Sequence, residues 1–242
     1  MKKTTVNILG VDFINEHFNG MIEIVSGKIA EEQKTFIVTA NPEIVMHAYK
    51  DKEYHNIINK ADYIVPDGIG IILASKIIKN PLEERIAGYD LTISLLEKAN
   101  LQKWSIYVLG GQEEVNKLAV KNIIEKYPNL KIAGRHHGFF ELNDPEIVND
   151  IKNTRPDIIL VALGFPRQEE WIGKHYDEFT KGIFMGVGGS IDVLAGTVKR
   201  APVIWQKLKV EWLYRLLKQP SRWKRMLALP DFVIKVMKLP KK

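Results

Sequence analysis

The apolar residues of this 242-residue chain fall in short runs, and amphipathic stretches separate these runs. Short runs rich in β-branched and aromatic residues predict strands, whereas apolar positions that recur about every 3.6 residues predict helices. The predicted strands are Thr35–Thr39, Tyr63–Val65, Ser105–Leu109, Ile158–Leu163 and Gly182–Gly186. The predicted helices between or beside them are Pro42–Lys50, Ile71–Ile78, Asp90–Ala99, Glu113–Lys126 and Arg167–Phe179.

This alternation predicts an α/β fold with a mostly parallel, Rossmann-like sheet and helices on both faces. The end of the chain follows another pattern, because it contains helical periodicity without strands. We predict a helix over Val203–Leu217, which Pro220 ends, and two short helices over Ser221–Leu229 and Asp231–Lys238, each opened by an N-cap residue. The chain is therefore expected to divide into an α/β core, residues 1–195, and a helical appendage, residues 196–242.

The net charge of +6 is unevenly distributed along the chain. Residues 196–242 hold 13 Lys and Arg against two acids, so the remainder of the chain has a net charge of −5. Three of the five tryptophans, Trp205, Trp212 and Trp223, also lie in this tail. A basic helix that carries Trp and Leu is suited to an anionic membrane surface. The alternative is a terminal helix whose apolar face packs on its own core or on a neighbouring subunit, and we favour membrane contact.

The composition excludes several classes of protein. The chain has no cysteine, which excludes disulfide frameworks, thiolate catalysis and zinc–thiolate sites and is consistent with a cytoplasmic protein. No uncharged apolar run approaches the roughly 18 residues that span a bilayer, and Val6–Val11 is too short for a signal peptide. His136 and His137 lack a third ligand at metal spacing, and no Asp-x-Asp occurs, so we expect no metal site.

Polar residues follow the predicted strands, where parallel sheets bind their ligands. Asp67 follows a strand and precedes Gly68, so its carboxylate is placed to act as a general base. The alternative is that Asp67 caps the helix that follows, and the residues alone favour the cap. Thr39 and Asn41 offer a hydroxyl and an amide to a polyhydroxylated ligand, or serve the turn that Asn-Pro favours.

Glycines and arginines supply further candidate sites for phosphate. Gly110 lies in a glycine turn before a helix, and Arg167 stands beside Gln168 at a helix start. A second loop contains Gly186, Gly188 and Gly189, with Asp192 after it as a candidate partner for a ribose hydroxyl. Each of these loops also has an interpretation as an ordinary turn. No βαβ unit follows the second loop, which argues against a dinucleotide site.

Arg85 and Asp90 flank Gly88 in the segment Glu84–Asp90. Opposite charges at this spacing indicate a charged pair beside a glycine. Asp90 has a second interpretation, as a cap for the helix that follows it.

Five ordered motifs carry a resemblance to a known family. They are Thr-Ala-Asn-Pro-Glu, Ala-Asp-Tyr-Ile-Val-Pro-Asp-Gly-Ile-Gly, Arg-Ile-Ala-Gly-Tyr-Asp, Leu-Gly-Phe-Pro-Arg-Gln-Glu and Gly-Val-Gly-Gly-Ser-Ile-Asp. In this order they resemble the WecG/TagA/CpsF glycosyltransferases, from about Thr35 to Thr197. The basic tail resembles the C-terminal appendage of the TagA branch, though less specifically.

The resemblance implies an inverting, metal-independent hexosyltransferase that needs no cofactor. In the TagA branch the donor is UDP-N-acetylmannosamine and the acceptor is undecaprenyl-diphosphate-linked N-acetylglucosamine. The product is the β-1,4 disaccharide lipid that begins wall teichoic acid linkage. The implied location is peripheral, on the inner face of the cell membrane.

The resemblance also assigns roles to residues. Asp67 becomes the general base, while Thr39, Asn41 and Gln168 orient the sugars. Arg85 is implied to bind the acceptor or leaving diphosphate, and the Gly186–Ser190 loop with Asp192 to bind uridine diphosphate. We add the hypothesis that three tail arginines reach over the site to the diphosphate: Arg215, Arg222 and Arg225.

Three alternatives remain open at this point. In the first, a transferase of the same fold uses another UDP-sugar as its donor, with N-acetylmannosamine uronic acid or glucose as the sugar. The second is a nicotinamide-dependent oxidoreductase on a similar sheet. The third is a nucleic-acid-binding module that uses the basic tail. We rank the last two well below the transferase and expect no nucleic-acid partner.

Overall fold

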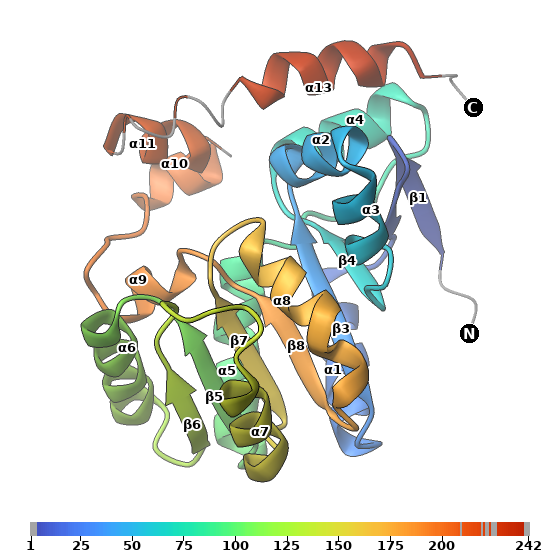
Figure 1. Cartoon of the computed structure of the whole chain (residues 1–242). Coiled ribbons are helices and arrows are strands. Elements are labelled where there is room, and N and C mark those ends of the chain that lie inside the picture. Colours follow the sequence, from blue (N-terminus) through green and yellow to red (C-terminus); the bar gives the residue numbers. More distant parts are fainter. Residues whose placement is uncertain (1–3, 209, 219, 221–222, 224–226, 240–242) are drawn as a thin grey trace.

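The computed structural model describes residues 4–208, 210–218, 220, 223 and 227–239 (Figure 1). Six strands form one sheet in the order β4-β3-β8-β7-β5-β6, and every neighbouring pair is parallel. The strands are β3 (Lys34–Ala40), β4 (Tyr63–Pro66), β5 (Ser105–Gly110), β6 (Lys131–His136), β7 (Ile158–Ala162) and β8 (Gly182–Gly186). Because all six run in one direction, the polar segments that follow them meet at a single edge. The predicted α/β fold is confirmed.

The sheet separates two apolar layers, because side chains alternate between its faces. In β3, Phe36 and Val38 join one layer, whereas Ile37 joins the other. The first layer is covered by α2 (Pro42–Lys50), α3 (Lys52–Ile58), α4 (Ile69–Ile77), α7 (Pro145–Thr154) and α8 (Arg167–His175). The second is covered by α1 (Phe18–Ala30), α5 (Gly88–Gln102), α6 (Glu113–Lys126) and α9 (Ser190–Leu194). Helices thus cover both faces, as predicted.

Several elements differ from the sequence prediction. A small antiparallel sheet of β1 (Thr5–Ile8) and β2 (Val11–Ile14) precedes the core and was not predicted. Also unpredicted were α1, α3, β6 and α7. The helix expected over Arg167–Phe179 ends at His175 and continues as the 3-10 turn η1 (Tyr176–Glu178). β1, β2 and α3 are short, and β6 is only half-buried, so their apolar pattern is weak.

The prediction of one tail helix over Val203–Leu217 is wrong. The structure has α10 (Val203–Lys207) and α11 (Glu211–Lys218), separated by a turn in which the Val210 N–H donates to the Trp205 carbonyl. The last helix, α13 (Ala228–Met237), starts before Asp231, which lies in its first turn and is not the N-cap. Most of the helix expected over Ser221–Leu229 lies outside the described residues.

The helix α13 crosses α2 and α4 at one end of the molecule (Figure 1). Phe232 and Val236 are buried in the first apolar layer, and Asp231 forms an ion pair with Lys50 at 2.9 Å. This face of the tail therefore packs on its own core, which was the alternative to membrane contact. Within the described ranges, no helix has both the length and the apolar character needed to cross a bilayer.

Candidate functional site

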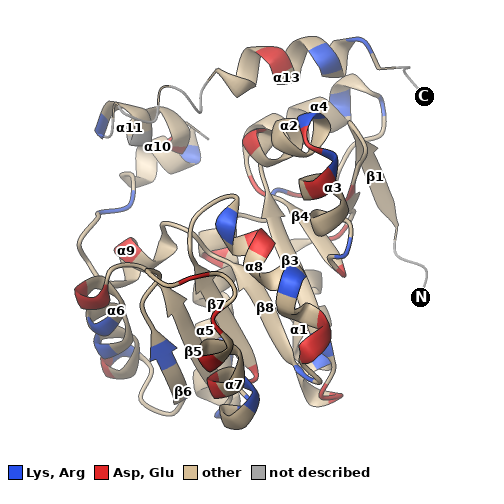
Figure 2. Cartoon of the chain, in the orientation of Figure 1, with Lys and Arg blue, Asp and Glu red and all other residues tan. Residues whose placement is uncertain are grey.

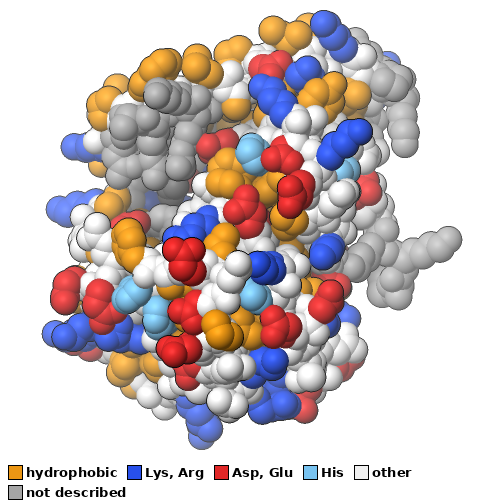
Figure 3. Space-filling model, viewed as in Figure 1, with side chains coloured by type: hydrophobic (Ala, Val, Ile, Leu, Met, Phe, Trp, Pro, Cys, Tyr) orange, Lys and Arg blue, Asp and Glu red, His pale blue; other side chains and the backbone are white. Residues whose placement is uncertain are grey.

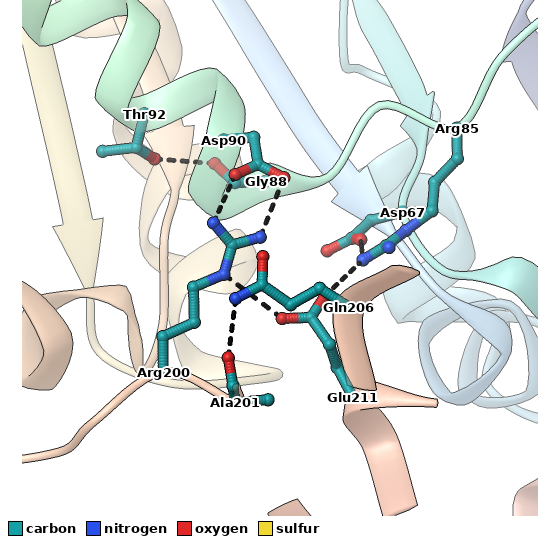
Figure 4. Close-up of polar contacts among 9 residues, drawn as sticks. All are labelled: Asp67, Arg85, Gly88, Asp90, Thr92, Arg200, Ala201, Gln206 and Glu211. Carbon is teal, nitrogen blue, oxygen red and sulfur yellow. Dashed lines mark hydrogen bonds and ion pairs between the residues drawn. The ribbon is translucent and has the colours of Figure 1, made fainter. Parts of the chain in front are cut away.

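Asp67 stands directly after β4, at the edge where the parallel strands end. Its N–H donates to the Ala40 carbonyl at 2.9 Å, which fixes the turn beside β3. Gly68 has φ +104° and is the N-cap of α4, a conformation that favours glycine. The Asp67 Oδ1 lies 3.4 Å from Arg85 Nη2 (Figure 4). The carboxylate therefore faces a guanidinium. The N-cap of α4 is Gly68, so the prediction that Asp67 is the N-cap is wrong.

Arg85 is held beside the same strand end. The N–H of Ile86 donates to the Pro66 carbonyl at 2.9 Å, which ties this segment to β4. The second contact of Arg85 Nη2 is Glu211 Oε2, at 3.3 Å, from the tail helix α11. The Arg85 Nε is buried and has no hydrogen-bond partner in the described part of the chain. Arg85 thus links the core site to the tail.

The predicted pair between Arg85 and Asp90 is wrong. Asp90 instead accepts two hydrogen bonds from Arg200, at 2.6 and 3.0 Å (Figure 4). Asp90 lies in the first turn of α5, whose N-cap is Ala87, so it is not the helix cap either. The reason is geometric: in the structure the tail brings Arg200 to this helix start, and a linear sequence does not indicate that approach.

Arg200 continues the row of charges into the tail. Its Nε donates to Glu211 Oε1 at 3.2 Å, and its guanidinium lies 4.7 Å from the centre of the Tyr89 ring. Alternating charges therefore run from Asp67 through Arg85, Glu211 and Arg200 to Asp90 (Figure 4). The sequence analysis missed Arg200 and Glu211. The available signal was that Glu211 is one of two acids in a strongly basic tail.

Thr39 lies between the end of β8 and the start of α5. Its Oγ1 donates to the Gly186 carbonyl at 3.4 Å. A Cβ on Gly88 would lie 2.9 Å from the same Oγ1, so glycine permits this close approach. The structure thus brings Thr39 and the glycine loop together, because β3 and β8 are neighbours in the sheet.

Asn41 caps a helix in the structure. Its Oδ1 accepts from the Ile44 N–H at 3.1 Å, as the N-cap of α2. The turn interpretation of the Asn-Pro sequence is therefore confirmed for this oxygen. A role in orienting a sugar stays a prediction.

Gln168 is buried at the start of α8, and both ends of its amide are engaged. The Oε1 accepts from the Gly188 N–H at 3.0 Å, and the Nε2 donates to Glu169 Oε1 at 2.7 Å. A Cβ on Gly186 would lie 2.5 Å from Nε2. Gln168 therefore holds the Gly186–Ser190 loop in place, and its direct contact with a sugar stays a prediction.

Glu169 is a buried carboxylate that the sequence analysis did not select. Its side chain is 1% exposed, and burial raises its pKa to about 7, although the hydrogen bond from Gln168 offsets part of this shift. Tyr54 is buried next to it, and burial together with the Glu169 charge raises the Tyr54 pKa. In the sequence, the Gln-Glu pair at a predicted helix start could have indicated Glu169 as a candidate.

Gly110 and Arg167 have structural contacts at the same edge. A Cβ on Gly110 would lie 2.4 Å from the Ala162 backbone, so the glycine permits close strand packing. Arg167 Nη1 donates to the Gly138 carbonyl at 2.7 Å, and Nη2 donates to the Phe140 carbonyl. Arg167 is therefore tied to the loop after β6, and phosphate binding by either residue stays a prediction.

The remaining predicted residues lie in or after the glycine loop and in the tail. Gly188 has φ +46°, Gly189 is the N-cap of α9, and Asp192 lies within that helix. Arg215 belongs to α11. Arg222 and Arg225 lie outside the described residues.

Chemically, the site combines a partly exposed carboxylate, an adjacent guanidinium and a glycine loop. The carboxylate suits proton abstraction from a hydroxyl, and the guanidinium suits an anion such as a diphosphate. Among the described side chains, no three His, Asp or Glu residues are grouped as metal ligands.

Comparison with known proteins identifies the family of the chain. The model of the family described as "Glycosyl transferase WecG/TagA/CpsF family" matches residues 6–242. A protein of Staphylococcus aureus (strain MW2) is 43% identical over 239 residues, which cover 98% of this chain and 94% of the relative. The relative from strain MRSA252 is 42% identical over the same extent. Both are named N-acetylglucosaminyldiphosphoundecaprenol N-acetyl-beta-D-mannosaminyltransferase. On this evidence the chain belongs to the WecG/TagA/CpsF family of glycosyl transferases.

Proposed function

We propose that this transferase moves N-acetylmannosamine from UDP-N-acetylmannosamine to the 4-hydroxyl of undecaprenyl-diphosphate-linked N-acetylglucosamine. The product is the β-1,4-linked disaccharide lipid of wall teichoic acid synthesis. The observation that carries the proposal is the Asp67 carboxylate facing Arg85 at the carboxyl edge of the sheet. The names of the 43% identical relatives support the donor sugar and the acceptor.

In the proposed reaction, Asp67 removes the proton from the acceptor 4-hydroxyl. The oxygen attacks C1 of the donor sugar from the face opposite the diphosphate, so the O4–C1 bond forms and the bond from C1 to the diphosphate oxygen breaks. The electron pair leaves with UDP, the proton stays on Asp67, and the configuration at C1 inverts. Arg85 stabilises the negative charge of a diphosphate beside it.

We assign the donor to the glycine loop and the neighbouring strand ends. The Gly186–Ser190 loop and Asp192 bind the uridine diphosphate, while Thr39, Asn41 and Gln168 orient the sugars. The contacts of Thr39 and Gln168 with this loop support the assignment, because they connect the sugar side of the site to the diphosphate side. The reaction requires no metal ion in this proposal, since basic side chains and backbone N–H groups hold the diphosphate.

We propose that residues 1–195 carry the chemistry and that residues 196–242 bring the enzyme to its lipid acceptor. The appendage attaches to the anionic inner face of the cell membrane. Large apolar side chains support this role, because many are exposed on or beside α10, α11 and α13. Figure 3 shows hydrophobic side chains along the top of the molecule, where α13 lies. They are Val203, Ile204, Leu208, Trp212, Leu217, Val233, Ile234 and Met237. Basic residues accompany them (Figure 2), and each contributes about 1 kcal/mol near an anionic leaflet.

The test is a UDP-release assay with a soluble lipid-diphosphate N-acetylglucosamine acceptor. UDP-N-acetylmannosamine and UDP-glucose are offered in parallel, with EDTA present. Release with the first donor alone supports the donor, the acceptor and metal independence. Release only after magnesium is added contradicts metal independence, and release with UDP-glucose alone contradicts the donor.

A further inference from the structure

Two neighbouring polar side chains are buried at the start of α8. Gln168 is 5% exposed and Glu169 is 1% exposed. The two side chains contact each other, since Gln168 Nε2 donates to Glu169 Oε1 at 2.7 Å. Burying a carboxyl group costs free energy, and the proposed reaction does not use Glu169. The position of Glu169 therefore requires another explanation.

The Gln168–Glu169 pair contacts the glycine loop that follows β8. Gln168 Oε1 accepts from the Gly188 N–H at 3.0 Å. A Cβ on Gly186 would lie 2.5 Å from Gln168 Nε2 and 3.1 Å from Glu169 Oε1, so glycine leaves room for both side chains. Gly186 lacks the positive φ that Gly188 has, so space rather than backbone conformation favours glycine at this position.

Glu169 helps to determine which end of the Gln168 amide meets the loop. The Gly188 N–H needs an acceptor opposite it, whereas a carboxyl oxygen needs a donor. Both needs are met with Oε1 toward Gly188 and Nε2 toward Glu169. The reversed amide would place two N–H groups together at Gly188 and two oxygens together at Glu169. The two contacts thus select one orientation of the amide.

We propose that Glu169 is a positioning residue, which holds the oxygen of the Gln168 amide toward Gly188 and thereby fixes the Gly186–Ser190 loop for the donor diphosphate. This inference rests on the proposed function, in which that loop binds uridine diphosphate. An ordered loop loses little conformational freedom when it binds a ligand. It binds the donor equally well before and during the reaction, so its disorder raises the donor KM and leaves kcat nearly unchanged.

The test compares a variant that removes the acceptor with one that keeps it. Glu169→Met is expected to raise the KM for UDP-N-acetylmannosamine roughly ten-fold, with kcat within about three-fold of wild type. Glu169→Gln still offers an oxygen to Gln168 Nε2, so its KM is expected to stay within about two-fold of wild type. Glu170→Met is the matched control, because it removes the adjacent, half-buried carboxylate of the same helix and is expected to keep the wild-type KM.

Hydrogen exchange of the free enzyme measures the order of the loop without any substrate. The amides of residues 186–190 are expected to exchange faster in Glu169→Met than in wild type, Glu169→Gln or Glu170→Met. Thermal unfolding shows whether Glu169→Met folds. If it does not fold, Gln168→Glu tests the same contact, because it keeps an acceptor for Gly188 and loses the donor to Glu169. The same rise in KM and in loop exchange is expected there.

These measurements distinguish a failure of this inference from a failure of the proposed function. A wild type that releases no UDP from UDP-N-acetylmannosamine overturns the proposed function, while loop exchange still tests the role of Glu169. Wild-type loop exchange in Glu169→Met, or in Gln168→Glu where that variant replaces it, overturns the positioning role. Equal impairment of Glu169→Gln and Glu169→Met also overturns it, because the charge rather than the acceptor would then matter.

Discussion

The tail helices α13 and α11 meet the same core in opposite ways. α13 inserts Phe232 and Val236, which are 2% and 1% exposed, into an apolar layer. α11 meets the core through Glu211, whose carboxylate lies between two arginines. Salt screens ion pairs, whereas charge screening does not weaken the burial of apolar surface. Apolar burial therefore fixes α13 to the body of the protein, while ion pairs connect α11 to the site.

The largest effect is expected at Asp67, which α11 approaches through Arg85. Asp67→Asn is expected to lower kcat by roughly 10²–10⁴, the range for loss of a positioned base. Both tail helices are expected to remain docked, because neither rests on Asp67 alone. UDP release measures kcat, and thermal unfolding is the control. A lower melting temperature with matching loss of folded protein would mean that Asp67 stabilises the fold and would contradict its role as the base.

The next prediction concerns the apolar packing that holds α13 on the core. Phe232→Ala is expected to destabilise the docking of α13 by about 3–5 kcal/mol, the usual cost of removing a buried Phe side chain. Faster hydrogen exchange in α13 measures this loss. Val233→Ala is the matched control, since Val233 is 46% exposed on the same helix. Equal exchange in the two variants would show that α13 is not held by burial.

A smaller effect is expected for the ion pairs that Arg200 forms with Asp90 and Glu211. Arg200→Lys keeps the charge but loses the planar fork that binds Asp90 through two nitrogens. We expect faster exchange in α11 and a few-fold lower kcat, both growing at higher salt. Lys199→Met is the control, because it removes a neighbouring exposed charge. A response to salt that is the same in Arg200→Lys and in wild type would contradict the ionic contact.

The smallest expected effect concerns Lys50. Its pair with Asp231 is exposed, so Lys50→Met is expected to change the free energy of unfolding by less than about 1 kcal/mol. Chemical denaturation measures this difference. A loss as large as that of Phe232→Ala would mean that charge, rather than apolar burial, anchors α13.

Much of the core was predictable because buried parallel strands have a strong sequence pattern. β3, β5, β7 and β8 were all predicted to within a residue or two, and Asp67 was selected because it follows a strand. β6 was missed, since a half-buried strand lacks a long apolar run. α7 was also missed, although Asp144, Pro145 and the buried positions Ile147, Val148 and Ile151 give it an amphipathic helical pattern.

The contacts between site and tail were not predictable from spacing. Asp90 was expected to pair with Arg85, yet its partner Arg200 is far along the chain. Local charge patterns indicate neighbours on one element, whereas tertiary approach selects partners from distant segments. The same limit applies to Gln168, because its contacts with Gly188 and Glu169 were not indicated by the sequence.

The buried Glu169 also has a consequence for stability. Burial raises its pKa from 4.5 to about 7, so the folded protein keeps a proton that an unfolded chain loses. The folded state then binds more protons than the unfolded state in this range. The free energy of unfolding is therefore expected to fall as pH rises from about 4.5 to about 7, and to level off above it. Glu169→Gln should flatten this slope in denaturation curves.

The same proton bears on how enzyme kinetics are interpreted. Assays on the two sides of pH 7 compare molecules that differ in the ionisation of Glu169, beneath the loop that Gln168 holds. A change in rate between these conditions is therefore not evidence about Asp67 by itself. A pH–rate profile recorded in the Glu169→Gln background removes this second titration, and the remaining acidic limb can then be assigned.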